Sequence, residues 1–186
     1  MSALPRKLFV YVARDANTAV ILRKERSRGK HSFQMIKWDL ETNTFVEGHW
    51  LLNKKICTTA CSISPNGEYF GWLYIKYHHC FDGDNGTHAG ISLVPHFTAI
   101  LYGNKGVGTH LRVNFDEQGN PIDNQGFEQK HPEMLLPISC SKIPIESGLQ
   151  EAQFISKTGQ HVVVDGYKLM VDDVVLYDAA DNCFVR

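Results

Sequence analysis

Residues 60–75, ACSISPNGEYFGWLYI, carry the local signal that decides the fold. Pro65 fixes φ at the second position of a turn, and Asn66 and Gly67 tolerate the left-handed conformations that close a short strand connection. The flanking residues are rich in aromatic and apolar types, which predicts a short strand before the turn and a longer strand after it. A strand-turn-strand unit is therefore expected here.

Related patterns return elsewhere in the chain. Residues 152–164 repeat the layout, with Ser156 and Gly159 in the places of Ser64 and Gly67. An aromatic residue followed by aspartate opens a polar turn at Trp38-Asp39, Phe115-Asp116 and Tyr177-Asp178. Units of this kind stack on one another because a single unit cannot bury both of its faces.

The turn at residues 64–67 resembles the Ser-Pro-Asp-Gly turn of WD40-like and TolB-like propeller blades, with Asn66 where those families usually carry Asp. The chain is also similar, mainly over residues 8–103, to small uncharacterised bacterial proteins with an aromatic-Asp turn followed by a Cys-x-Leu-Ser-Pro-Asp-Gly-like segment, here residues 61–67. The resemblance implies a fold of blade-like repeats, and it implies no activity.

Two hairpins are expected before this unit. Apolar runs at residues 8–13 and 18–22 enclose a short turn. Residues 32–38 carry apolar side chains on both faces, which is typical of a strand that is covered on two sides. Residues 45–50 then return after a polar turn.

We therefore predict a single all-β domain over residues 1–186, an antiparallel meander of two to three propeller-blade-like units, with a twisted β-sandwich as the alternative. Its expected parts are the first hairpins (8–58), a blade-like unit (59–122), a loop-rich insert (123–149) and a last blade-like unit (150–186). Closed propellers have at least four blades, so the sheet edges of this chain must be left open, covered or shared.

Composition and length point to an ordinary globular protein. Hydrophobic residues make up 43% and charged residues 21% of the chain, which argues against disorder. No apolar run approaches the roughly 20 residues that cross a bilayer, and the start lacks a signal-peptide core, so a cytoplasmic location and no membrane partner are expected. The five cysteines are odd in number and irregularly spaced, which favours reduced thiols.

The net charge of −1 conceals an asymmetry, because residues 1–60 carry eleven Lys/Arg against five acids. Much of this excess lies in residues 23–30, which predict either a solvated hairpin loop or a contact patch for an anionic partner. Trp50, after His49 at the end of a hairpin, is a candidate interface anchor. The candidate partner-binding residues are Arg23, Lys24, Arg26, Arg28, Lys30, His49 and Trp50.

Residues 77–88 hold the densest group of metal-capable side chains. The spacing matches no standard zinc pattern, and the Glu that would end a calcium loop is replaced by Leu93. An exposed polar loop without a cofactor is expected, with a zinc or calcium site as the alternative. The residues of that alternative site are His78, His79, Cys80, Asp82, Asp84 and His88.

No catalytic motif stands out. The glycines of residues 103–109 fit neither the phosphate-loop nor the dinucleotide pattern, and Gly-x-Ser-x-Gly is missing. Cys57 and Cys61 lie four apart and are expected to fill the core. We assign no catalytic residue and do not expect an enzyme.

The leading hypothesis is a protein-interaction module without catalysis, of inhibitor or immunity type, with a protein partner and possible homo-oligomerisation through sheet edges. One alternative is a metal-assisted hydrolase that uses residues 78–88. Another is contact with an anionic ligand or nucleic acid through residues 23–30. A sequence pI of about 6.7 argues against general nucleic-acid binding.

Overall fold

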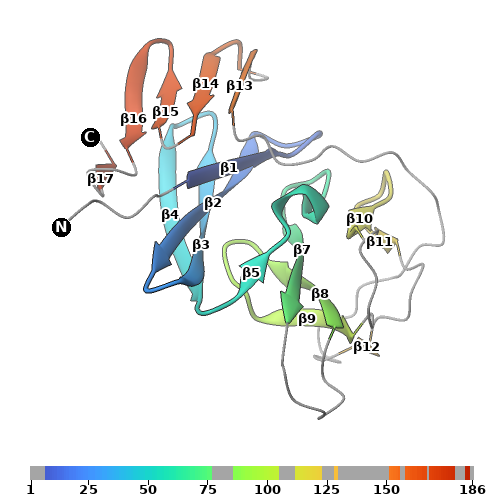
Figure 1. Ribbon diagram of the computed structural model, residues 1–186. Helices are drawn as coiled ribbons and strands as arrows, with labels where there is room; N and C mark the ends of the chain where they lie inside the picture. The colour runs from blue at the N-terminus through green and yellow to red at the C-terminus, as the bar shows by residue number, and fades with distance from the viewer. Residues whose placement is uncertain are drawn as a thin grey trace.

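The computed structural model confirms the predicted all-β, antiparallel fold (Figure 1). It describes residues 7–76, 86–104, 112–122, 128–129, 151–155, 158–166, 168–178 and 183–184. Within these ranges, the helical structure consists of one short 3-10 turn, η1 (Thr58–Ala60). No helix in the described part of the chain is both long and apolar enough to cross a membrane.

The first sheet is a four-stranded meander in chain order, and it contains both predicted hairpins. Its strands are β1 (Lys7–Val12), β2 (Thr18–Ser27), β3 (Lys30–Asp39) and β4 (Thr44–Leu51). Strands β2 and β3 pair along their whole length, from Thr18 opposite Asp39 to Ser27 opposite Lys30. This long pairing carries the β2–β3 hairpin away from the β1–β2 turn, so the two turns lie at opposite ends of the sheet.

Two further antiparallel sheets and a small hairpin follow. The second sheet contains β5 (Lys55–Ile56), β6 (Ser62–Ile63), β7 (Tyr69–Lys76), β8 (Gly86–Leu93), β9 (Ala99–Asn104) and β12 (Glu128–Gln129). The small hairpin is formed by β10 (Asn114–Phe115) and β11 (Pro121–Ile122). The third sheet contains β13 (Glu151–Ile155), β14 (His161–Asp165), β15 (Lys168–Val171), β16 (Val174–Asp178) and β17 (Cys183–Phe184).

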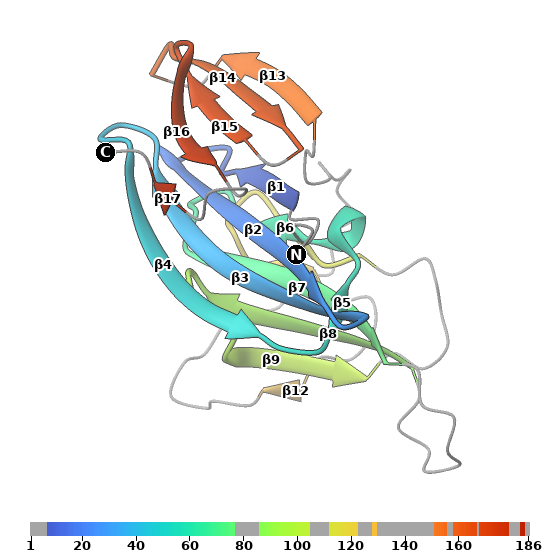
Figure 2. The ribbon, with the colours of Figure 1, turned by 60° about the vertical axis from the view of Figure 1, so that its left-hand side comes forward.

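The first sheet lies between the other two (Figure 2). One of its faces packs Ile21 and Trp38 against the third sheet. The opposite face packs Val20 and Met35 against Phe70 and its neighbours in the second sheet. Burial on both faces explains the apolar residues on both sides of the β3 sequence, and it confirms the predicted doubly covered strand.

The outer face of the second sheet is covered by the small hairpin. Ile91 and Leu101 pack there with Val113 and Phe115. Gly71 makes this close approach possible, because a Cβ at that position would lie 2.3 Å from Cγ1 of Val113. The side chains of the small hairpin therefore rest directly on the backbone of β7.

Both edges of the first sheet are bonded to its neighbours. The Leu8 N–H in β1 donates to the Gly166 carbonyl of the third sheet at 2.7 Å. The His49 N–H in β4 donates to the Pro95 carbonyl of the second sheet at 3.2 Å. None of the sheets in the described ranges closes on itself, and the relation to propeller blades stays a prediction.

Candidate functional site

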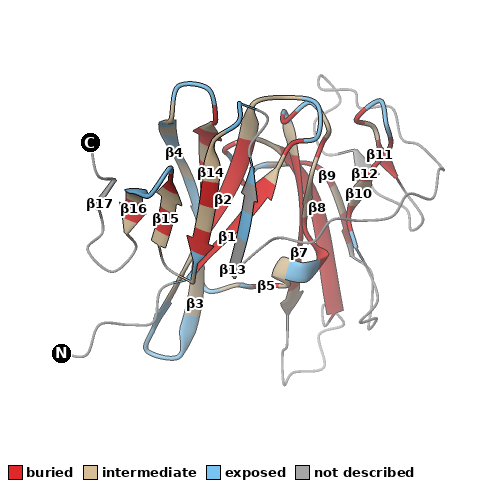
Figure 3. Cartoon of the chain, turned by 90° about the horizontal axis from the view of Figure 1, so that it is seen from above, coloured by how far each residue is buried: buried red, intermediate tan, exposed pale blue. Residues whose placement is uncertain are grey.

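The basic run at residues 23–30, for which a solvated hairpin loop was one expectation, forms the end of a hairpin between two paired strands. Strand β2 continues to Ser27 and β3 begins at Lys30, so the turn consists of Arg28 and Gly29 alone. Their φ angles of 48° and 80° fit the two-residue turn that matches the twist of paired strands. Backbone pairing extends β2 through the charged residues, and the exposed tip projects from the sheet (Figure 3).

Arg28 occupies a backbone conformation that does not suit it. Two-residue hairpins of this type prefer Asn, Asp or Gly at the first turn position, because other residues place Cβ too close to a carbonyl oxygen. The exposed arginine therefore contributes charge at the tip at some expense of local stability. Such local inconsistencies are characteristic of functional positions.

Strand alternation divides the basic run between two faces of the hairpin. Arg23 follows Ile21 on the face turned to the third sheet. Lys24 and Arg26 follow Leu22 on the face turned to the second sheet. The basic run therefore contributes side chains to two chemically different surfaces of the hairpin.

The first of these surfaces, which we call the aromatic face, consists of Arg23, Glu25, Gln34, Glu47 and Trp50. Arg23, Gln34 and Trp50 stand in register across three strands. The Arg23 guanidinium lies 5.4 Å from the centroid of the Trp50 ring and forms an ion pair with Glu25. Gln34 Nε2 donates to Glu47 Oε2 at 3.0 Å.

Burial differs sharply between Arg23 and Trp50, two of the predicted partner-binding residues. The Arg23 residue is only 6% exposed, whereas Trp50 is 37% exposed. The sequence prediction that Trp50 remains partly exposed is thus confirmed. The described structure brings Arg23 and Trp50 together. His49 lies apart from them, because its ring centroid is 4.4 Å from that of His96 in the connection between β8 and β9.

The second surface, which we call the cation face, draws on four segments of the chain. Lys7 stands opposite Lys24 in the β1–β2 pair, and Arg26 stands opposite His31 in the β2–β3 pair. The segment before β5 is fixed beside β3 because the Lys54 N–H donates to the His31 carbonyl at 3.1 Å. The complete cation face is Lys7, Lys24, Arg26, His31, Lys54 and Lys55.

The cations of this face lie close enough to disfavour one another's charge. Burial lowers the pKa of Lys24, and neighbouring Lys7 lowers it further, with smaller effects from Lys55 and Arg26. Burial likewise lowers the pKa of His31, with added repulsion from Lys24 and Arg26. Sequence reasoning missed Lys7, His31, Lys54 and Lys55, and the Lys54-Lys55 pair was the one local sign of them.

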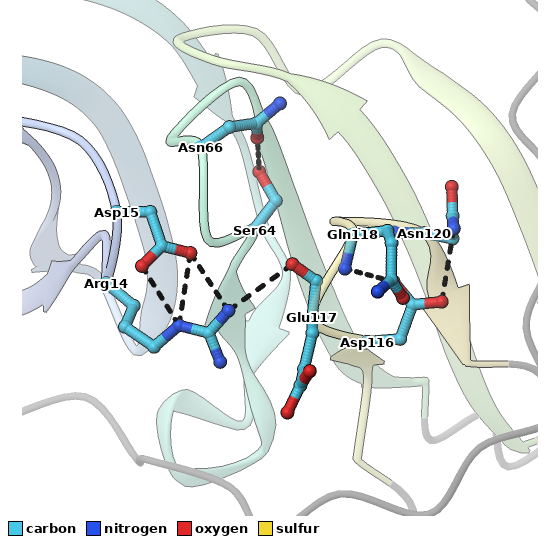
Figure 4. Close-up of polar contacts among 8 residues, drawn as sticks. All are labelled: Arg14, Asp15, Ser64, Asn66, Asp116, Glu117, Gln118 and Asn120. Atoms are coloured by element: carbon cyan, nitrogen blue, oxygen red, sulfur yellow. Dashed lines mark hydrogen bonds and ion pairs between the residues drawn. The ribbon is translucent and has the colours of Figure 1, made fainter.

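At the opposite end of the first sheet, three turns meet in a hydrogen-bonded network (Figure 4). Arg14 Nη2 donates to the Asp15 carboxylate at 2.9 Å and to the Glu117 carbonyl at 3.3 Å. Ser64 Oγ bonds to Asn66 Oδ1 at 2.6 Å and accepts the Tyr69 N–H at 2.9 Å. These polar groups stabilise the turns, and few of their hydrogen-bond donors and acceptors remain for a ligand.

At two of its three occurrences the aromatic-Asp motif caps a turn, whereas Asp178 at the third forms an ion pair with Lys168 at 3.6 Å. Oδ1 of the buried Asp116 accepts the N–H groups of Gln118 at 3.0 Å and Asn120 at 2.8 Å. Asp39 accepts the N–H groups of residues 41 and 42 in the same way, and these bonds lower its pKa. The recurrence seen in the sequence thus serves the fold.

The predicted metal residues His78, His79, Cys80, Asp82 and Asp84 lie outside the described residues. His88, the remaining member, is buried in β8, where Nδ1 lies 2.7 Å from the Tyr102 hydroxyl. In the part of the chain that the structure describes, no three His, Cys, Asp or Glu side chains gather as a metal site would require. The zinc or calcium alternative stays a prediction.

Two cysteines have described side chains, and of these Cys57 is half-buried and Cys61 is buried. Cys61 is buried in the core, and its Sγ lies 3.3 Å from the Cys57 carbonyl. Burial raises the pKa of the Cys61 thiol to about 12. The thiol is therefore protonated at neutral pH and serves as a small core residue, as the sequence suggested.

Comparisons with protein-family models, with curated proteins and with solved structures found no match for this chain. Function must therefore be inferred from the surfaces of the chain itself. Among the described residues, the two faces of the β2–β3 hairpin combine exposure, charge and a large aromatic side chain, which makes the hairpin the candidate functional site.

Proposed function

We propose that the chain is a protein-binding module without catalytic activity, of inhibitor or immunity type, and that it binds its partner through the aromatic face. The observation that carries the proposal is the exposed Trp50 stacked with Arg23 on a paired sheet. Trp and Arg dominate the binding energy of protein interfaces, particularly at well-packed central positions.

The aromatic face is preorganised for binding. Arg23 is held from two sides, by the Trp50 ring and by Glu25, while Gln34 is bonded to Glu47. These side chains stand on strands whose register is fixed by backbone pairing. Because these side chains have little conformational freedom left to lose, their part of the entropic cost of association is reduced.

Exposed apolar residues adjoin the same strand. Val46 in β4 is 54% exposed, and Leu52 directly after β4 is 60% exposed. Together with Trp50, they place three of the five large exposed hydrophobic residues of the described structure within residues 46–52. Strand alternation turns Val46, which stands opposite Lys37, to the side of β4 away from Glu47 and Trp50, so Trp50 is the exposed hydrophobic residue of the aromatic face itself.

The test compares Trp50→Ala with Val174→Ala, an exposed apolar residue of the third sheet. A partner captured by the wild-type chain is identified, purified and titrated against each variant. Truncation of a central aromatic anchor costs about 2 kcal/mol, so Trp50→Ala weakens Kd about thirtyfold. Val174→Ala leaves Kd within about twofold, as expected for a residue outside the interface.

Acrylamide quenching of tryptophan fluorescence gives an independent measurement. All three tryptophans are described, and Trp38 and Trp72 are buried, so quenching reports chiefly on Trp50. Saturation with the purified partner should protect this fluorescence. An equal Kd for wild type and Trp50→Ala, with quenching unchanged in the complex, would contradict the proposal.

A further inference from the structure

We infer that the cation face binds an acidic peptide segment of the partner, through carboxylates that alternate along an extended chain. The inference rests on the proposed function and names the chemistry of the partner. The aromatic face and the cation face are the two sides of one hairpin, so a partner that grips the hairpin meets both surfaces.

The cation face carries charges that have no counter-ion among the described residues, although Lys24 Nζ lies 6.0 Å from the Phe33 ring centroid and Lys54 Nζ lies 4.9 Å from that of Tyr74. Within the described residues, Lys7, Lys24, Arg26, Lys54 and Lys55 form no ion pair; those that occur involve Arg14, Arg23 and Lys168. Glu25, the acid within the basic run, is turned to the other side of β2 and pairs with Arg23. Like charges brought together in this way are stabilised by an incoming anion.

His31 adds a titratable group to the cation face. Its Nδ1 atom is shielded from solvent, and it has no hydrogen-bond partner among the described residues. The residue stands between Arg26 across the strand pair and the Lys54 backbone. A carboxylate at this position would compensate the surrounding charge and stabilise the protonated imidazole.

The arrangement of the cations favours several carboxylates over a single phosphate. Lys24 and Arg26 lie two residues apart on one face of β2, a separation of about 7 Å. Alternate side chains of an extended acidic peptide have the same spacing. Four of the five permanently basic residues are lysines, which act as point charges and lack the bidentate fork that suits phosphate.

The inference is tested with three probes at one ionic strength. Fluorescent hexaglutamate and a fluorescent single-stranded oligonucleotide of six nucleotides are titrated directly. Pyrophosphate is titrated as a competitor of hexaglutamate. Hexaglutamate is expected to bind the wild-type chain in a saturable manner. Lys24→Glu is expected to weaken this binding about tenfold, because an attraction becomes a repulsion. Lys24→Ala gives a milder loss in the same direction and serves if the charge reversal perturbs folding.

The matched control is Arg112→Glu, which changes the net charge equally at an exposed residue away from the hairpin. It should leave hexaglutamate affinity within about twofold, since distant surface charges are screened at this ionic strength. Equal weakening by Arg112→Glu and Lys24→Glu would overturn the inference. So would tighter, Lys24-dependent binding of pyrophosphate or the oligonucleotide, either of which would assign the face to phosphate groups.

The purified partner separates failure of this inference from failure of the proposed function. If Trp50→Ala weakens partner binding while Lys24→Glu does not, the aromatic face is the interface and the acidic-segment inference is wrong. If neither variant weakens it, the proposed function is wrong as well. The inference is supported when both variants weaken partner binding and Trp50→Ala retains hexaglutamate affinity.

Discussion

The two ends of the first sheet use polar residues in opposite ways. At the turn end, the side chains of Asp116 and Ser64 accept hydrogen bonds from neighbouring backbone N–H groups. At the hairpin end, Lys24 is repelled by Lys7, Lys55 and Arg26. Arg28 there occupies a turn position that suits asparagine better. The contrast separates residues that stabilise the fold from residues to which we propose that a partner binds.

The largest expected effect lies at the turn end. Asp116→Ala removes a buried carboxylate that accepts three hydrogen bonds from residues 118 and 120. We expect the free energy of unfolding to fall by about 3 kcal/mol, because the freed N–H groups lose a charged acceptor. Denaturant unfolding measures the change.

Its control is Glu117→Ala, since Glu117 is exposed and contributes its backbone carbonyl to the network. That substitution should change the free energy of unfolding by less than about 0.5 kcal/mol. A loss of stability in Asp116→Ala no greater than in Glu117→Ala would remove the distinction between the two ends.

At the hairpin tip, a substitution should stabilise the chain. Arg28→Asn places a residue that tolerates a φ of 48° at the first turn position. We expect the free energy of unfolding to rise by about 0.5 to 1 kcal/mol, measured by thermal and denaturant unfolding. Unchanged or reduced stability would show that Arg28 is accommodated without strain.

The smallest effect concerns His31. Its pKa in the folded chain is lowered, so the unfolded chain binds the proton more readily. Wild-type stability should therefore decline relative to His31→Gln as the pH falls through about 6.5 and below, and the two should run parallel at higher pH. A stability difference that is independent of pH between 8 and 5 would show that neither burial nor the cation face lowers the pKa of His31.

The sequence predicted those features of the fold that depend on residues close together in the chain. The turn at residues 64–67 forms as expected, with Gly67 at a φ of 74°, because Pro, Asn and Gly restrict the backbone directly. The exposure of Trp50 followed from its place at the end of a hairpin. The doubly covered β3 strand followed from apolar residues on both of its faces.

What the sequence could not predict depends on pairing between distant segments. The charged residues of β2 have weak strand propensity, yet pairing with β3 extends the hairpin through them. The cation face is assembled by register, which places Lys7 against Lys24 and brings Lys55 beside them. The aromatic-Asp pattern was visible, but its capping role required the turn geometry of Asp39 and Asp116.

Hydrogen exchange of the purified complex tests most directly whether the hairpin end is the binding surface. The free chain and the complex are compared amide by amide after identical exchange times. We predict new protection at residues 23–34 and 47–52, with the three turns of Figure 4 unchanged. Protection confined to those turns, around residues 14–15, 64–68 and 116–120, would contradict the assignment of binding to the hairpin end.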